Sequence, residues 1–170
     1  SGRPFTGDFA GILLYETLHR FGFANRPESV SVDDGLNLKN CRITNARCVG
    51  ITLGLAPGVD YDDIEAYGDH IVRHNIIRRC GQAGIAGRKG PTRSLICNNL
   101  IEDTNYRKEF GGWETAAVKF HNSVDTVISG NLIISNVASL AHCGQGGGIH
   151  LWRYGNLSGA QVQFNQVLSN

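Results

Sequence analysis

The sequence predicts an all-β fold, a right-handed parallel β-helix of about five coils. Three observations lead to this prediction: a motif that recurs along the chain, a second strand signal after most copies, and the composition. The 170 residues include 22 glycines and only 4 prolines, and 41% of the chain is apolar. This composition is typical of packed strands joined by turns and not of a disordered segment.

The recurring motif is an apolar residue, any two residues, an Asn, any residue and a second apolar residue. Its copies are Val72–Ile77, Ile96–Ile101, Ile128–Ile133, Val162–Val167 and an earlier one, Leu38–Ile43, with Cys41 in the Asn position. That position, here called the slot, falls at residues 41, 75, 99, 131 and 165, so the steps are 34, 24, 32 and 34 residues. A β-helix coil needs on the order of 20 to 30 residues, so the longer steps indicate inserted loops. We expect the slot Asn residues to stack as a hydrogen-bonded ladder with an architectural role.

A second strand signal, usually opened by a small residue, follows in each complete coil. The copies are Gly50–Leu53, Gly84–Gly87, Ala117–Phe120 and Gly148–Leu151. Two strand signals in each period, without a helical stripe, favour a parallel coil of the pectate-lyase type over a sandwich. We therefore expect one domain over residues 1–170, with a partial coil and a long loop over residues 1–35. Because an uncapped solenoid end exposes apolar surface, we also expect sequence to be missing beyond both ends.

The net charge, the length of the apolar runs and the cysteine count limit the kinds of partner and compartment that fit the chain. A formal net charge of +1 argues against a nucleic-acid partner, and no apolar run approaches the length of about 18 residues that a membrane span needs. The five cysteines, at 41, 48, 80, 97 and 143, are an odd number without a C-x-x-C pair, and we expect them to be buried thiols. We expect an extracellular or periplasmic protein, although no signal-peptide pattern opens the chain.

Strand alternation places a group of polar side chains on one outer face. If Ile51, Ile85, Val118 and Ile149 point inward, the next residues, Thr52, Ala86, Lys119 and His150, point outward. Two residues further, the outward positions hold Gly54, Arg88, His121 and Trp152, and Trp113 lies in the loop before the third copy. Indoles stack on sugar rings, and charged side chains bond to sugar hydroxyls. The sequence therefore predicts a saccharide surface with Arg88, Trp113, Lys119, His121, His150 and Trp152 as substrate-binding residues.

Glycoside cleavage normally requires two carboxylates. Glu114 is the candidate catalytic residue, because it lies just upstream of the strand that carries Lys119, in the loop Phe110–Glu114. Asp125 precedes another strand and is expected in a turn. No cofactor or metal is expected, although Asp60, Asp62 and Asp63 in the insertion 58–68 could bind Ca²⁺ if they do not form a solvated acidic loop.

The segments Gly68–Asn75, Cys80–Gly87 and Glu114–His121, with Asp125–Asn131 after them, resemble glycoside hydrolase family 120, which contains β-xylosidases. The similarity spans roughly residues 36–155, and Glu114–His121 is its most diagnostic part. The resemblance implies a retaining hydrolase with an Asp nucleophile and a Glu acid/base. Here the residue after Gly148–Leu151, where that nucleophile is expected, is Trp152, and the acid/base position would lie beyond Asn170. This departure makes the chain a fragment or a divergent member.

Three functions stay open at this point. The first is a glycoside hydrolase-like protein acting on plant-type, xylo-oligosaccharide-like substrates. The second is a polysaccharide lyase or epimerase, in which Arg88, Lys119, His121 and His150 would neutralise and deprotonate a uronate. The third is a non-catalytic carbohydrate-binding or adhesion module, which the Trp at position 152 favours. Fold alone does not choose among them.

Overall fold

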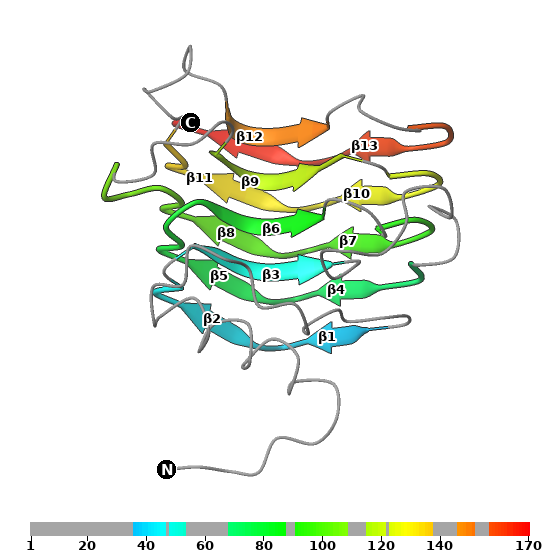
Figure 1. The fold of residues 1–170 in the computed structure, drawn as a ribbon, viewed down its shortest axis with the longest axis horizontal. Helices are drawn as coiled ribbons and strands as arrows, with labels where there is room; N and C mark the ends of the chain where they lie inside the picture. The colour runs from blue at the N-terminus through cyan, green and yellow to red at the C-terminus, as the bar shows by residue number, and fades with distance from the viewer. Residues whose placement is uncertain are drawn as a thin grey trace, which may run out of the picture.

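The computed structural model describes residues 36–46, 48–53, 68–87, 91–108, 115–121, 123–137, 146–151 and 157–170. These residues form a right-handed parallel β-helix, as the sequence predicts, and every named element in them is a β-strand. Neighbouring coils stack one on the next, from β1 and β2 to β13 and β14 (Figure 1). The inner faces of the coils enclose one continuous core.

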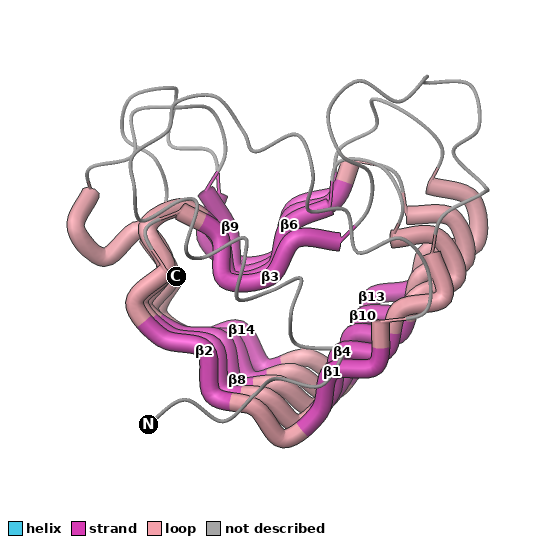
Figure 2. Tube along the Cα trace, turned by 60° about the horizontal axis from the view of Figure 1, so that its bottom comes forward, coloured by secondary structure: helices cyan, strands magenta, loops and turns pink. Residues whose placement is uncertain are grey.

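Three parallel sheets form the sides of the solenoid (Figure 2). The first sheet contains β1 (Asn37–Lys39), β4 (Ile71–Arg73), β7 (Leu95–Cys97), β10 (Val127–Ser129) and β13 (Gln161–Gln163). The second contains β2 (Arg42–Thr44), β5 (Ile76–Arg78), β8 (Leu100–Glu102), β11 (Leu132–Ile134) and β14 (Gln166–Leu168). The third contains β3 (Val49–Leu53), β6 (Ala83–Gly87), β9 (Thr115–Phe120) and β12 (Gly146–Leu151).

The repeated motif is therefore not one strand but two, and a complete coil has three strands instead of the two that the sequence indicated. The motif bends at the residue before the slot, which takes a left-handed conformation in every coil. These residues are Asn40, His74, Asn98, Gly130 and Phe164, with φ between 53 and 64°. A second left-handed column ends the strands of the second sheet, at Asn45, Arg79, Asp103, Ser135 and Ser169. Because one residue makes each bend, the two short strands are nearly continuous in sequence.

The predicted Asn ladder is present and runs through the bend between the first and second sheets. The side-chain amide of Asn75 donates to Oδ1 of Asn99 at 3.0 Å, and that of Asn99 donates to Oδ1 of Asn131 at 3.0 Å. Each slot backbone N–H donates to the same oxygen, and each Nδ2 also donates to a strand carbonyl of the preceding coil, as Asn99 does to Val72 at 2.9 Å. Cys41 starts the ladder, since its backbone N–H donates to Oδ1 of Asn75. Buried amides with all these partners are held in place and hold the coils in register.

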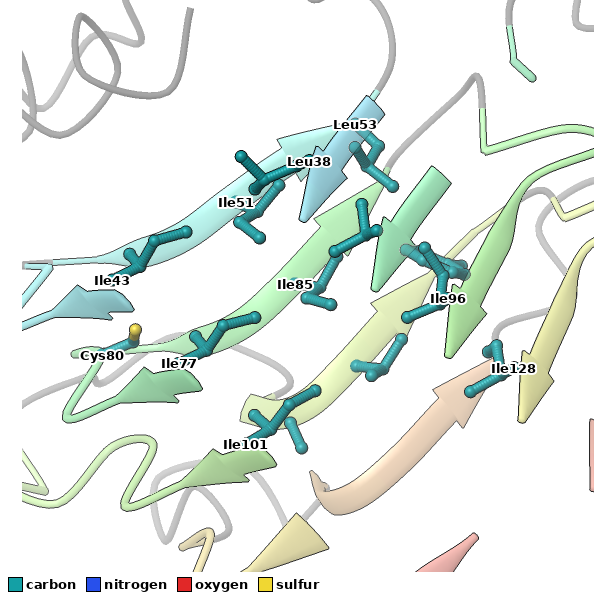
Figure 3. Close-up of a cluster of buried hydrophobic side chains, with 14 of the residues drawn as sticks. Leu38, Ile43, Ile51, Leu53, Ile77, Cys80, Ile85, Ile96, Ile101 and Ile128 are labelled. Carbon is teal, nitrogen blue, oxygen red and sulfur yellow. The ribbon is translucent and has the colours of Figure 1, made fainter. Parts of the chain in front are cut away.

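Inward side chains of all three sheets meet in the core (Figure 3). The predicted inward column of the third sheet is confirmed: Ile51 pairs in register with Ile85, Ile85 with Val118, and Val118 with Ile149. The first three are fully buried, and Ile149 packs against the core from a partly exposed position. Leu38, Val72, Ile96 and Ile128 form a matching column in the first sheet.

The small residues that open the third-sheet strands are required by packing. A Cβ on Gly84 would lie 2.5 Å from Cγ2 of Ile101 and 2.8 Å from the carbonyl oxygen of Ala117. A Cβ on Gly50 would lie 2.8 Å from the carbonyl oxygen of Gly84. The strand therefore approaches its neighbours closely where the chain enters the third sheet.

The prediction of buried thiols is right for Cys80 and wrong for three others. Cys41, Cys48 and Cys97 are half-buried: Cys41 packs against the core from its edge, and Cys97 stands at an outward position of β7, next to the buried Ile96. Burial nevertheless raises the pKa of the Cys41 and Cys97 thiols, which keeps them protonated at neutral pH. Cys143, residues 1–35 and the insertion with Asp60, Asp62 and Asp63 lie outside the described residues. Within the described ranges, no helix is long and apolar enough to cross a membrane.

Candidate functional site

The outer face of the third sheet carries the predicted outward column in the predicted order. Thr52 pairs with Ala86, Ala86 with Lys119, and Lys119 with His150. Adjacent parallel strands lie about 4.8 Å apart, so the backbones of Lys119 and His150 are direct neighbours on successive coils. Both side chains are half-buried. The structure thus brings together an ammonium group and an imidazole on one outer face.

His121 extends this face by one step. Its backbone N–H donates to the carbonyl oxygen of Gly87 at 3.0 Å, so pairing between β9 and β6 continues beyond Phe120. Strand alternation then places His121 on the same side of the sheet as Lys119, while Phe120 between them is buried in the core. His121 is also half-buried. Lys119, His121 and His150 together are called the outer-face cluster below.

The other predicted site residues, Arg88, Trp113, Glu114 and Trp152, lie outside the described residues. Chain connectivity still relates three of them to the third sheet. Arg88 directly follows the last residue of β6, Glu114 directly precedes the first residue of β9, and Trp152 directly follows the last residue of β12. Their roles, including that of Glu114 as a catalytic carboxylate, stay predictions.

Two further residues clarify the limits of the site. Asp125 lies in a turn with φ of 51°, and its backbone N–H donates to the carbonyl oxygen of Ser158, so the prediction of a turn role is confirmed. Thr52 stands in the outward column, and its hydroxyl oxygen is buried without a hydrogen-bond partner among the described groups. Alternation predicted the outward position of Thr52, but a Thr at such a position is common and did not mark it as a binding residue.

Comparison with known proteins gives two different partial likenesses. No family model matches the chain. Type-5 uracil-DNA glycosylase of Mycobacterium bovis is 52% identical over 44 residues, which are 26% of this chain and 16% of that protein. The Thermus thermophilus protein of the same description is 49% identical over 49 residues, which are 28% of this chain and 22% of that protein. The chain thus spans less than a quarter of the length of these curated relatives.

The solved structures give a likeness of far greater extent. The complex structure of XylC with xylose superposes with a TM-score of 0.60 and 24% sequence identity. The superposition covers 85% of this chain and 27% of that one. This likeness agrees with the strand order and parallel register described above. The fold class is therefore a parallel β-helix.

Proposed function

We propose that this chain is the saccharide-binding β-helix of a glycoside hydrolase-like protein, and that the outer face of the third sheet binds a xylo-oligosaccharide-like substrate. The observation that carries the proposal is the parallel pairing of Lys119 with His150, with His121 on the same side. The strand register places three polar side chains along one face of the sheet. A row of polar side chains suits a ligand that presents a row of hydroxyl groups.

The chemistry of the cluster fits binding and orientation of a neutral sugar. An ammonium group donates hydrogen bonds to ring and hydroxyl oxygens, and an imidazole either donates or accepts. The fold reinforces the spacing, because the neighbouring inward residues Val118 and Ile149 are locked in the core packing. Trp113 and Trp152 would supply apolar faces for the sugar ring.

Cleavage would depend on Glu114. In this proposal its carboxylate acts as acid/base or nucleophile at a glycosidic bond, and a second carboxylate has to lie nearby. The Trp at position 152, where the resemblance places the nucleophile, argues that this chain alone binds sugar without cleaving it efficiently. In this proposal the outer-face cluster is sufficient for sugar binding, whereas cleavage also requires a second carboxylate.

The likeness to the XylC structure supports the proposal, because that protein was observed with xylose and shares the fold. The whole protein would then be extracellular or periplasmic, where plant-type oligosaccharides are encountered. A lyase or epimerase would use the same cluster to neutralise a uronate, and its product would carry a new double bond or an inverted centre.

A second candidate function comes from the short sequence matches. About half of 44 to 49 residues are identical to type-5 uracil-DNA glycosylases, so removal of uracil from DNA is the activity to test beside sugar hydrolysis. Release of uracil from a uracil-containing oligonucleotide would establish this function. It would also contradict the expectation, drawn from the net charge, that nucleic acid is not a partner. No release would leave the saccharide proposal as the one that the structure supports.

The direct test of the sugar proposal is hydrolysis of xylobiose and a panel of aryl glycosides, followed by product chromatography. Glu114→Gln should abolish any turnover without unfolding the chain. Asp125→Asn is the matched control, because it removes a carboxylate in the same coil at a positive φ that Asn tolerates. Unchanged turnover in Glu114→Gln would reject Glu114 as the catalytic group. Binding of xylobiose without turnover would favour the non-catalytic module.

A further inference from the structure

The outer face of the first sheet carries two cations directly opposite each other. Lys39 ends β1 and Arg73 ends β4, and the two residues pair in parallel register. The residues before them, Leu38 and Val72, are fully buried, so alternation along the strands points Lys39 and Arg73 outward. Adjacent strands lie about 4.8 Å apart. Because like charges on neighbouring strands repel, this pair lowers the stability of the fold unless an anion lies beside it.

No carboxylate of these two coils offsets the two charges. Residues 36–46 and 70–80 contain five Lys or Arg residues and no Asp or Glu. Within the described ranges, neither Lys39 nor Arg73 forms an ion pair. The next residue of the same column is Cys97, and burial raises the pKa of its thiol, which therefore stays neutral. The column thus carries positive charge on two adjacent coils and no negative charge beside it in the described structure.

The guanidinium group of Arg73 also has unused hydrogen-bonding capacity. Its Nε is buried and has no acceptor among the described groups, although the residue as a whole is half-buried. A buried N–H without an acceptor is costly. A guanidinium group donates two parallel N–H groups to an oxyanion, so a bound oxyanion would give Nε its acceptor. His74, which is exposed at the bend directly after Arg73, places an imidazole beside the two cations.

We propose that Lys39 and Arg73, with His74 beside them, form a binding site for the phosphate or sulfate group of a ligand. One oxygen of this tetrahedral group would accept from Nζ of Lys39, and two others would accept from the guanidinium group of Arg73. Binding would remove the repulsion between the two cations, which a neutral sugar does not do. Because the column continues with the neutral Cys97, the site fits one compact anionic group and not a long row of charges.

This anion site is separate from the outer-face cluster. Lys39 and Arg73 lie where the first sheet meets the bend to the second sheet, and this bend lies across the solenoid from the third sheet (Figure 2). The site therefore does not depend on the sugar proposal, and either one can fail without the other.

The first test is titration of the full chain with inorganic phosphate, followed by NMR at an ionic strength held constant with NaCl. The amide signals of Lys39, Arg73 and His74 should shift together and saturate, with a Kd of about 1 mM. Arg73→Gln should raise this Kd about tenfold. Arg79→Gln is the matched control, because it removes the same charge from an exposed position of the same coil, and it should change the Kd less than about twofold.

A second measurement keeps the proposal testable if Arg73→Gln does not fold. Lys39→Gln removes the repulsion, so at low salt without phosphate it should raise Tm by about 1 to 2 °C. Phosphate should raise the Tm of the unsubstituted chain and leave that of Lys39→Gln unchanged. Lys108→Gln, which removes an exposed Lys from another coil, should change neither value. A lower Tm for Lys39→Gln without phosphate would contradict the repulsion on which the site is based.

A short single-stranded oligonucleotide is the second probe, and it identifies the source of the anionic group. Tighter binding of the oligonucleotide than of phosphate, weakened by Arg73→Gln, would support the site and assign it to a nucleic-acid phosphate. Saturable binding of phosphate alone would support the site and assign it to a small ligand. Shifts that do not saturate and are equal at Arg79 and Lys108 would mean an adventitious ion only and would overturn the proposal. The absence of shifts at Lys39 and Arg73 at tens of millimolar phosphate would overturn it as well.

Discussion

Lys119 of β9 and His150 of β12 stand opposite each other in parallel register on adjacent coils. The residues before them, Val118 and Ile149, point the other way and pack in the core. The spacing of the two polar residues is thus set by the strand repeat and not by a loop. A ligand that contacts both side chains therefore meets a fixed backbone, and only the side chains themselves have to be ordered when it binds.

Substitution of either member should weaken sugar binding. Lys119→Gln and His150→Gln are each expected to raise the Kd for xylobiose about tenfold, the loss of roughly one hydrogen bond to a charged or polar group. Isothermal titration calorimetry measures the change. Arg42→Gln, on an exposed position of the second sheet, is the control and should leave the Kd unchanged. Equal affinities in all the proteins would mean that the ligand does not contact this face.

Removal of an interior ladder residue should be far more costly than removal at the last coil. Asn99 is buried, and Asn99→Ala would remove the acceptor of the backbone N–H and of one Nδ2 hydrogen of Asn75, together with a hydrogen bond to the carbonyl of Val72. We expect a loss of about 3 kcal/mol or more in the free energy of unfolding, measured by urea denaturation. Asn165→Ala should cost about 1 kcal/mol, because water reaches that half-buried position. Similar losses at both positions would contradict the role given to the ladder.

The close approach at Gly84 predicts a steric penalty. Gly84→Ala places a methyl group against the carbonyl oxygen of Ala117, which is backbone and shifts only with its strand. The expected destabilisation is about 1 to 3 kcal/mol in thermal or urea unfolding. Ala86→Ser, at an outward position of the same strand, should change stability by less than about 0.5 kcal/mol. A stabilised Gly84→Ala variant would show that the strand has more room than described.

One ion pair predicts a modest dependence of stability on pH. Arg93 donates to both carboxylate oxygens of Asp69, at 3.1 and 2.8 Å, and these hydrogen bonds lower the pKa of Asp69. A lowered folded-state pKa stabilises the fold above the unfolded pKa of about 3.9, and this contribution is lost as the pH falls through the folded value. Because both side chains are largely exposed, Asp69→Asn should cost less than about 1 kcal/mol at pH 7. The difference from the unsubstituted chain should shrink as the pH falls below the unfolded pKa of about 3.9, and an undiminished difference in strong acid would point to a cause other than the ion pair.

Much of the fold could be predicted from the two-residue alternation of side chains along the strands and from the spacing of the repeated motif. Alternation placed Ile85 inward and Lys119 outward, and the spacing of the Asn slots predicted the ladder. The third strand of each coil could not be predicted, since the bend before the slot is made by one residue and Phe164 is not a typical left-handed residue. A second, shorter Asn ladder, just after the strands of the second sheet, also could not be predicted, because its positions show no repeated residue in the sequence. Asn136 donates to Oδ1 of Asn170 at 2.8 Å, but Thr104 and Cys80 occupy the equivalent positions of the preceding coils.

The candidate site could be predicted only in part. The strand pattern gave the positions of Lys119, His121 and His150, because they lie on or directly beside regular strands. The positions of Glu114, Trp113 and Trp152 depend on connections between strands, and loop geometry does not follow from a two-residue period. Thr52 was not a candidate, since its buried hydroxyl becomes apparent only from the packing around it.

The most direct test of the central claim is NMR mapping of xylobiose binding on the full chain. We predict that the amide signals of Lys119, His121 and His150 shift together on titration, while those of the exposed second-sheet residues Arg42 and Ile76 stay unchanged. Shifts confined to other parts of the chain, or no shifts at millimolar xylobiose, would contradict the assignment of the third sheet as a saccharide surface.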